Sequence, residues 1–248
     1  MLTTWHTTWG VEVVATALAA LYLRNALHVT GWPVIRTVSA IGALAVVVVT
    51  VDSGLGAAVS RSFAVGVVVQ LLLSSVVPPL WVAGRPGELL RRGWSERVSA
   101  ALDRLRAVVR AATAAPTVLV VYALVVVLTR LTAFPVAVAT NPVLGVLEQL
   151  LWLGAGLMVF STALGAHRAA AGLLLLTGAA AVTTAGGLVL AAVPAVLVPA
   201  FSPDDVHRGG TILWAAGGGL VLVIVAALGC RWAMDRPSRA RSGRCPVH

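Results

Sequence analysis

Long apolar runs recur along this chain, separated by short connections that hold most of its charged residues. About 20 consecutive apolar residues suffice to cross the hydrocarbon core of a bilayer. Only 11% of the residues are charged and 59% are hydrophobic, whereas about a quarter of the residues of an ordinary soluble domain are charged. The chain cannot cover the water-facing surface of a soluble domain with this inventory, so we expect an integral membrane protein whose surroundings are the lipid bilayer.

The apolar runs divide into seven segments with approximate boundaries. They are Trp9–Leu23, Val34–Val51, Ser62–Trp81, Ala112–Arg130, Leu144–Leu164, Ala170–Val193 and Gly209–Cys230. Helices are expected, because a lipid-embedded backbone must satisfy its own hydrogen bonds and the runs lack the alternation of barrel strands. The predicted fold class is all-α: a polytopic bundle of seven transmembrane helices within residues 1–232. A basic tail, residues 233–248, is expected to be disordered.

The arginines predict the orientation of this bundle. All 18 basic residues are arginines, and they concentrate in the first, third and fifth connections and in the C-terminal tail. The alternate connections are poor in arginine and hold Asp52, Asp204 and Asp205. Because cytoplasmic loops are enriched in basic residues, we expect the N-terminus outside and the C-terminus in the cytoplasm, in a bacterial plasma membrane.

The third connection, residues 84–110, carries seven of these arginines. Its segment Ser95–Arg110 has apolar residues on one helical face and predicts an amphipathic helix at the cytoplasmic membrane surface. No aromatic residues interleave with the arginines in the way that nucleic-acid surfaces require, so nucleic acid is not an expected partner.

Ionisable side chains within the apolar runs are the first candidates for function, because burying them in lipid is costly. Arg130 ends the fourth segment and Glu148 opens the fifth, and we expect them to form an ion pair across a short connection. Gln70 and Gln149 are polar neighbours, so the four side chains are predicted to form a polar intramembrane cluster. Glu12 lies near the outer end of the first segment and is expected to reach water.

A metal site has weaker support in the sequence. Asp204, Asp205 and His207 lie together before the last segment and are weak candidates for metal ligands. Aspartates at a helix start more commonly accept hydrogen bonds from free backbone N–H groups, and we favour that role. No nucleophile–base set and no phosphate-binding loop is present, so we predict no catalytic residue and no enzyme.

Three stretches resemble motifs of the CtaG-type cytochrome c oxidase assembly factors. The stretch VVVQLLLSSVVPPLWVAGRPGELLRR is similar to the third-span signature of that family, NPVLGVLEQLLWLGAGLMVF to its fifth-span motif, and DDVHRGGTILWAAGGGL to its last-span motif. The order of the motifs also agrees. The matching positions include Pro78, Pro79, Gly84, Pro86, Asn141, Pro142, Asp205 and Trp214.

The resemblance implies a respiratory-chain role as a metallochaperone-like protein: assembly of the oxidase, contact with its catalytic subunit, and delivery of copper. Copper is bound by imidazole or sulfur ligands. The positions of the histidines in the family align with Val67, Leu71, Arg130, Gly145 and Gln149, which carry neither group. Copper is therefore implied by the resemblance alone, and direct copper binding is not expected from these residues.

Two functional hypotheses of different classes remain at this point. The first is a protein that aids oxidase assembly or copper delivery, with the order of the motifs in its favour. The alternative is a small-solute or ion transporter that uses the polar intramembrane cluster, although the sequence lacks the broken-helix signals typical of secondary transporters.

Overall fold

The structure is a computed structural model, and it describes residues 9–93, 114–166, 169–192, 201–219 and 222–226. Every regular element within these ranges is a helix, and none of them is a strand. The predicted all-α class is therefore confirmed. The expected amphipathic helix, residues 95–110, and the basic tail, residues 233–248, lie outside the described residues.

Across the described ranges, six helices are long and apolar enough to cross a membrane. They are α1 (Trp9–His28), α2 (Val34–Asp52), the composite α4–η1–α5 (Phe63–Leu71, Leu72–Val76 and Val77–Gly84), α10 (Pro142–Gly165), α11 (Ala169–Ala192) and α13 with its extension η2 (Pro203–Ile212 and Leu213–Gly217). A seventh apolar helix, α8 (Ala115–Arg130), is shorter. These seven helices lie at the seven segments expected from the sequence, and the chain is a multi-pass membrane protein.

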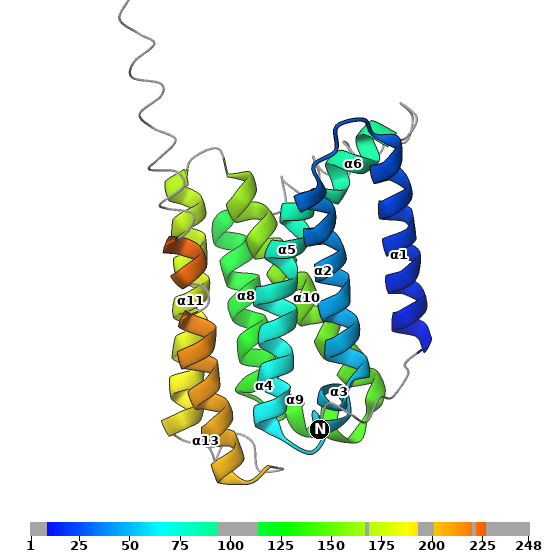
Figure 1. The fold of residues 1–248 in the computed structure, drawn as a ribbon. Coiled ribbons are helices and arrows are strands. Elements are labelled where there is room, and N and C mark those ends of the chain that lie inside the picture. The colour runs from blue at the N-terminus through cyan, green and yellow to red at the C-terminus, as the bar shows by residue number, and fades with distance from the viewer. Residues whose placement is uncertain (1–8, 94–113, 167–168, 193–200, 220–221, 227–248) are drawn as a thin grey trace, which may run out of the picture.

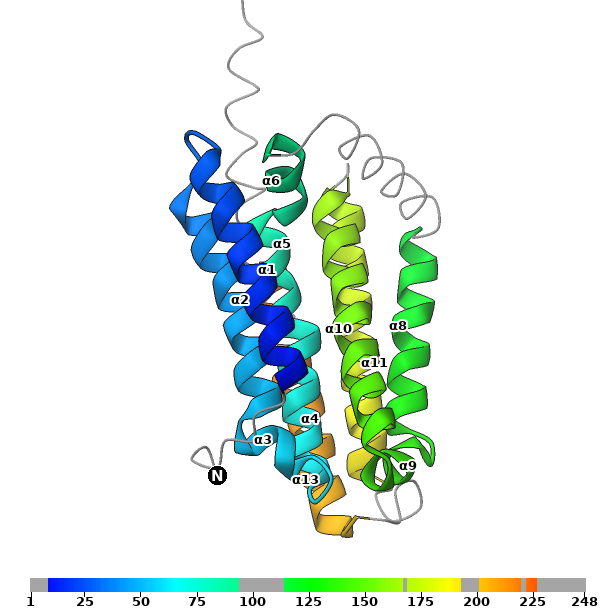
Figure 2. The ribbon, with the colours of Figure 1, turned by 90° about the vertical axis from the view of Figure 1, so that its right-hand side faces the viewer.

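Three short helices complete the described fold: α3 (Gly54–Ala58), α6 (Pro86–Gly93) and α9 (Phe134–Thr140). The spanning helices run side by side as a bundle, with α1 at one edge and α11 and α13 at the other (Figure 1). In the view turned by 90°, α3 and α9 lie at one end of the bundle and α6 lies at the opposite end (Figure 2). We refer to these as the α9 end and the α6 end.

The last spanning helix begins earlier than the sequence predicted. We expected it to start at Gly209, but α13 starts at Pro203. The side chain of Ser202 accepts a hydrogen bond from the backbone N–H of Asp205, and Pro203 occupies the first turn, where its missing N–H costs nothing. The prediction relied on hydropathy alone. The first turn of α13 is polar, so it lies outside the apolar run even though it is helical.

The third span is two α-helices joined by a wide turn. Pro78 and Pro79 have no backbone N–H, so the carbonyls of Ser74 and Ser75 lose their usual helical donors. The backbone from Leu72 to Val76 adopts the wider π-helical turn η1 at this point. Above and below it the neighbours differ, because α4 packs on α13 whereas α5 packs on α2.

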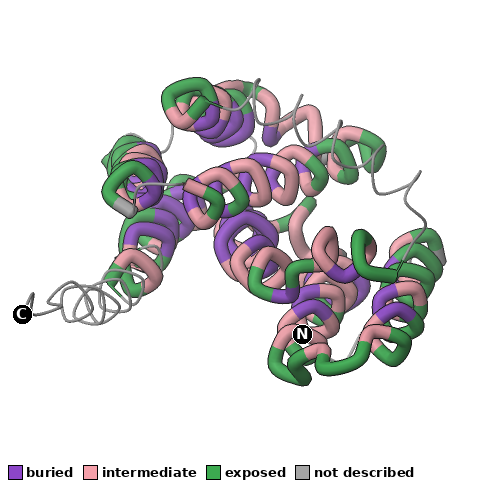
Figure 3. Tube along the Cα trace, turned by 90° about the horizontal axis from the view of Figure 1, so that it is seen from above, coloured by how far each residue is buried: buried purple, intermediate pink, exposed green. Residues whose placement is uncertain are grey.

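The packed interior lies where η1, α8, α10 and α11 meet. Its largest fully buried side chains include Trp152, Leu73 and Leu176. Large aliphatic side chains on the outer faces remain exposed, for example Val143 at 72% and Leu124 at 60%. The buried faces point inward and the exposed ones outward when the bundle is seen along its axis (Figure 3). An apolar surface of this kind is what a lipid-facing bundle requires.

Ion pairs around Glu88 hold the α6 end of the bundle together. Its carboxylate oxygens lie 3.3 Å from Arg36 Nη1 on α2, 3.2 Å from Arg85 Nη1 and 2.5 Å from Arg92 Nη2. Tyr22 on α1 donates a hydrogen bond of 2.7 Å to the carbonyl oxygen of Gly84. Helices α1, α2, α5 and α6 are thereby linked at the end where arginines gather.

Helix α10 approaches η1 so closely that only glycine fits at the crossing. A β-carbon on Gly156 would lie 2.7 Å from Pro78 Cγ and closer still to the carbonyl oxygen of Ser74. Small residues at helix crossings allow this approach in membranes, where no hydrophobic force drives helices together. Gly154, two residues earlier on α10, has nothing within 4 Å of an added β-carbon.

We therefore expect Gly156→Ala to lower the free energy of unfolding by about 1–3 kcal/mol, because the overpacked methyl group forces α10 away from η1. The matched control Gly154→Ala should be neutral or stabilising by up to about 1 kcal/mol, since alanine favours helix more than glycine does. Thermal unfolding of both variants in the same detergent checks the difference. Equal midpoints for the two variants would contradict the close crossing.

Candidate functional site

A cavity of about 290 Å³ lies among residues at the α9 end of the bundle. We call it the polar cavity because six polar side chains lie among its otherwise apolar walls. It is bounded by the end of α2, the α3–α4 region, Arg130 of α8, α9 and the first turns of α10. Its polar lining consists of Ser60, Gln70, Arg130, Glu148, Gln149 and Trp152. All four residues of the predicted polar cluster thus border the same cavity.

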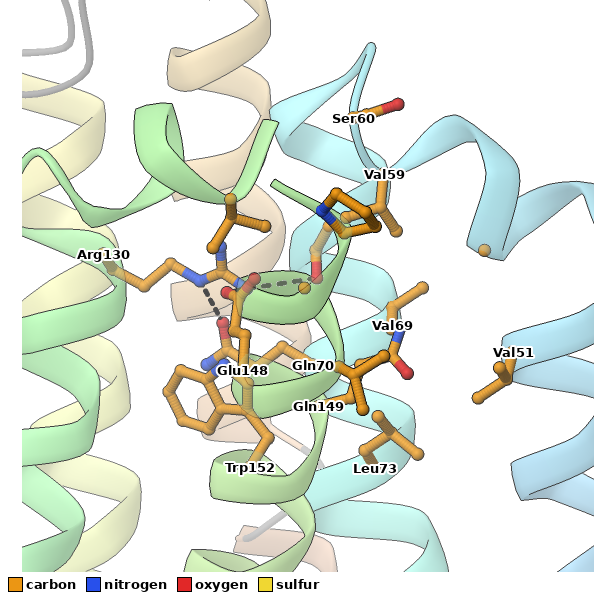
Figure 4. A pocket seen from close by; sticks show the side chains of 16 residues that line it. Val51, Val59, Ser60, Val69, Gln70, Leu73, Arg130, Glu148, Gln149 and Trp152 are labelled. Atoms are coloured by element: carbon orange, nitrogen blue, oxygen red, sulfur yellow. Dashed lines mark hydrogen bonds and ion pairs between the residues drawn. The ribbon is translucent and has the colours of Figure 1, made fainter. Parts of the chain in front are cut away.

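Arg130 is the centre of this arrangement. It is the last residue of α8, and its guanidinium reaches α4 and α10 (Figure 4). Its Nε donates to Gln70 Oε1 at 2.5 Å, and its Nη2 donates to the carbonyl oxygen of Gly66 at 3.2 Å. Its Nη2 also lies 3.1 Å from Glu148 Oε1. One side chain therefore connects three helices.

The ion pair between Arg130 and Glu148 is buried, as the two residues are only 3% and 6% exposed. Aromatic rings complete the surroundings of the guanidinium: Arg130 Cζ lies 5.4 Å from the ring centroid of Phe63 and 5.6 Å from that of Trp152. Cation–π attraction is strongest when the cation is removed from water, as it is at this site. The counter-charge and the rings together offset the desolvation of the guanidinium.

Two buried donors at the cavity lack acceptors. Gln70 and Trp152 are each 1% exposed, and neither Gln70 Nε2 nor Trp152 Nε1 has a hydrogen-bond partner among the described residues. Glu148 Oε1 faces Arg130 Nη2 at 3.1 Å, but the pair is not aligned as a hydrogen bond. Gln149 borders the cavity from α10.

Sequence reasoning did not identify Trp152, Phe63 or Gly66 as part of the site. A signal was present for two of them, since Trp152 follows Glu148 by one helical turn and Gly66 precedes Gln70 by one turn. Residues at i and i+4 share a helix face. Phe63 lies at the start of α4, and its contact with Arg130 depends on how α8 crosses α4, which the sequence does not encode locally.

Asp205 joins two helices rather than capping its own. Its Oδ1 accepts a hydrogen bond of 2.9 Å from Ser62 Oγ, and its Oδ2 accepts one of 2.6 Å from the backbone N–H of Phe63. We expected it to cap the helix that it begins, but Ser202 does so. The carboxylate instead caps α4, which favours a negative charge at the N-terminus of that helix.

The three weak metal candidates are not held in a metal site. Asp205 is occupied by α4, Asp204 is exposed, and His207 Nδ1 lies 2.9 Å from the carbonyl oxygen of Ala191. In the part of the chain that the structure describes, no group of three or more His, Cys, Asp or Glu residues is arranged to hold a metal ion. His6, Cys245 and His248 lie outside that part.

The other residues of the family motifs begin helices or lie at close helix contacts. Asn141 Oδ1 accepts a 2.9 Å hydrogen bond from the N–H of Val143, and Pro142 follows in the first turn, so the pair starts α10. A β-carbon on Gly187 of α11 would lie 2.5 Å from the backbone nitrogen of Trp214, which places the Trp214 backbone directly against α11. Pro86 opens α6, as described above.

A model of the family described as cytochrome c oxidase caa3 assembly factor (Caa3_CtaG) matches residues 16–235. The chain belongs to this family. No curated protein and no solved structure shows significant similarity to it.

In this member of the family, the positions that the resemblance pairs with histidines do not lie together. Val67 and Leu71 are buried in an apolar cluster with Leu190, Val206 and Leu213, on the side of α4 that faces α13. The other three positions, Arg130, Gly145 and Gln149, border the polar cavity.

The cavity does not fit a copper ion. None of its lining residues offers an imidazole or a sulfur ligand, the groups that copper prefers. Its central side chain is a guanidinium, which repels a cation and has no free acceptor. Within the described helices, the site is a neutralised ion pair beside which Gln70 Nε2, Trp152 Nε1 and Glu148 Oε1 have no aligned hydrogen-bond partner.

We expect Arg130→Leu to lower the free energy of unfolding by about 3–5 kcal/mol, because it leaves the Glu148 carboxylate buried without a counter-charge. The double variant Arg130→Leu/Glu148→Leu should be more stable than the single variant, since no charge then remains uncompensated. Unfolding in detergent, followed by circular dichroism, provides the measurement. Wild-type stability of the single variant would show that the ion pair does not hold the helices.

Removal of the Asp205 carboxylate should loosen the contact between α13 and α4. For Asp205→Ala we expect a loss of about 1–2 kcal/mol, as for other helix caps. The neighbouring exposed residue supplies the control, Asp204→Ala, which should change stability by less than about 0.5 kcal/mol. A hydrogen-exchange experiment should also show faster exchange in the first turn of α4 for Asp205→Ala only.

Proposed function

We propose that this chain assists the assembly of a caa3-type cytochrome c oxidase in the bacterial plasma membrane. The observation that carries the proposal is the family match over residues 16–235, which reaches from within α1 past the end of α13. The match is also the reason for preferring assembly to solute transport, which stays the alternative. On this proposal the partner is a subunit of the oxidase, most directly its catalytic subunit.

The role that we propose is non-catalytic and does not carry copper in the polar cavity. In support, Arg130 occupies the centre of the cavity, and its charge is already balanced by Glu148. An added cation would meet a fixed positive charge with no soft ligand to compensate it. If copper is the cargo of this chain, its ligands are not the residues of the cavity.

Deletion of the chain in its native host tests the assembly role. We expect oxidase activity and the content of assembled catalytic subunit in membranes to fall several-fold, and to recover when the wild-type chain is supplied again. The variant Asp204→Ala serves as the complementation control, since the side chain of Asp204 is exposed and is not among the residues that line the cavity. Wild-type oxidase levels in the deletion strain would contradict the proposal.

Metal analysis of the purified chain tests the second part independently. After equilibration with Cu(I) and removal of the excess, we expect the copper content to be the same for wild type and for Gln149→Leu. A stoichiometric copper ion that is lost in Gln149→Leu would place copper in the cavity, contrary to the proposal.

A further inference from the structure

A second pocket, of about 370 Å³, lies among residues at the α6 end of the bundle. Its lining comes from the end of α5, from the junction between α5 and α6, from α6 itself and from the last turns of α10. The lining residues include Trp81, Val82, Arg85, Glu88, Arg91 and Ser161. The side chains of Arg85, Arg91 and Ser161 are exposed, so the polar groups of this pocket are open to the surroundings of the bundle.

Positive charge exceeds negative charge at this pocket. Glu88 Oε2 lies 3.3 Å from Arg36 Nη1 and 3.2 Å from Arg85 Nη1, and its Oε1 pairs with Arg92 Nη2. Arg91 lines the pocket as a fourth arginine. Four positive charges and one negative charge leave a formal charge of +3. Both oxygens of the carboxylate are engaged, so the pocket attracts an anion and offers nothing to a cation.

Arg85 keeps hydrogen-bond donors that an anion can reach. Its contact with Glu88 uses Nη1, and its side chain is 59% exposed. A guanidinium carries five N–H donors on three nitrogens, in a fork that matches the oxygens of a carboxylate or a phosphate. The guanidinium of Arg91 is exposed as well and borders the same pocket. Two such groups at one pocket suit an anion with several oxygens, as in a phosphate ester.

The backbone at Arg85 would accommodate a different residue more easily. Its φ of 48° and ψ of 49° place it in the left-handed region, and it is the one non-glycine residue with a positive φ in the part of the chain that the structure describes. Glycine and asparagine adopt this conformation most readily, because a larger side chain crowds the backbone. An exposed ion pair such as that with Glu88 contributes little to stability. The arginine at this position therefore indicates a further role for its charge.

An apolar wall lies next to the charges. Trp81 and Val82 line the pocket from the last turn of α5, which ends at Gly84. Figure 2 shows α5 ending where α6 begins, at the end of the bundle. Tryptophan is enriched at this level, where a membrane span leaves the hydrocarbon. A lipid can contact the arginines with its headgroup and this wall with its acyl chains, whereas a soluble anion would leave the wall uncovered.

We propose that this pocket binds an anionic phospholipid of the leaflet at the α6 end, with the phosphodiester on Arg85 and Arg91 and the acyl chains against Trp81 and Val82. Basic pockets at a membrane surface hold anionic headgroups in this way. Glu88 positions the Arg85 guanidinium for the contact. The site is separate from the polar cavity, and the proposal stands whether or not the assembly role does.

Native mass spectrometry of the full-length chain in a neutral detergent measures lipid binding, because it resolves each bound lipid by its mass. The two lipids are dioleoylphosphatidylglycerol and dioleoylphosphatidylcholine, which share their acyl chains and phosphate but differ in net charge. We expect the first phosphatidylglycerol to bind with a Kd at least about ten-fold lower than that of phosphatidylcholine. The soluble anion sn-glycerol 3-phosphate, added at the same concentration, should not displace it.

Three variants locate the site. Arg91→Gln should raise the Kd for phosphatidylglycerol about five-fold, the effect of one arginine near an anionic surface. Arg85→Gly should weaken binding to a similar extent and leave the thermal midpoint equal or higher, since glycine takes the left-handed conformation freely. This second readout separates loss of the site from failure to fold. The matched control is Arg24→Gln, an exposed arginine near the end of α1 that does not line the pocket, and its Kd should stay within about two-fold of wild type.

Several results would overturn the proposal. Equal affinity for the two lipids would mean that the acyl chains alone determine binding. A loss of affinity in Arg24→Gln as large as in Arg91→Gln would mean that general surface charge, and not this pocket, attracts the lipid. Displacement of phosphatidylglycerol by sn-glycerol 3-phosphate would identify a site for soluble phosphate esters. Wild-type affinity in both Arg85→Gly and Arg91→Gln would place the lipid elsewhere on the protein.

Discussion

A guanidinium buried among membrane helices can persist only if its charge and its donors are satisfied by the protein, and Arg130 is in that position. Glu148 supplies the counter-charge, Gln70 and Gly66 supply acceptors, and Phe63 supplies an aromatic face. These groups belong to α4 and α10, so satisfying one side chain of α8 fixes how three helices meet.

The rest of the bundle is held by contacts that need no hydrophobic force between helices. Glycine at the crossing of α10 with η1 lets backbones touch, and Asp205 ties the start of α13 to the start of α4. At the opposite end, Glu88 forms ion pairs with three arginines and so joins α2 to α6. In lipid, where burial of apolar surface does not favour association, such packing and polar contacts set the arrangement.

The sequence predicted the spans well because their signal is length and hydropathy, which the bilayer itself imposes. It also indicated the proximity of Arg130 and Glu148, because a short connection separates them and each needs a partner. It did not predict the role of Asp205, whose partners Ser62 and Phe63 are far away along the chain. Contacts between remote segments depend on helix crossings, and no local pattern in the chain records them.

The sequence also did not predict the change of helix phase within the third span. A sequence read as one continuous helix would place residues of α4 and α5 on a common set of faces, but η1 interrupts that phase. Within α4 itself, Val67 and Leu71 face α13, while Gly66 and Gln70 border the cavity. Of the positions that align with histidines of the family, Val67 and Leu71 therefore lie apart from Gly145, which borders the cavity.

The wide turn between α4 and α5 has a consequence for how this protein can change over evolutionary time. Helix α4 packs on α13, whereas α5 packs on α2. The turn η1 therefore joins two helices whose rotation about their own axes is fixed by different neighbours. Insertion or deletion of a single residue in η1 would rotate α4 or α5 by about 100° relative to the helix on which it packs. We therefore expect this span to change during evolution by amino-acid substitution, without insertions or deletions at the turn.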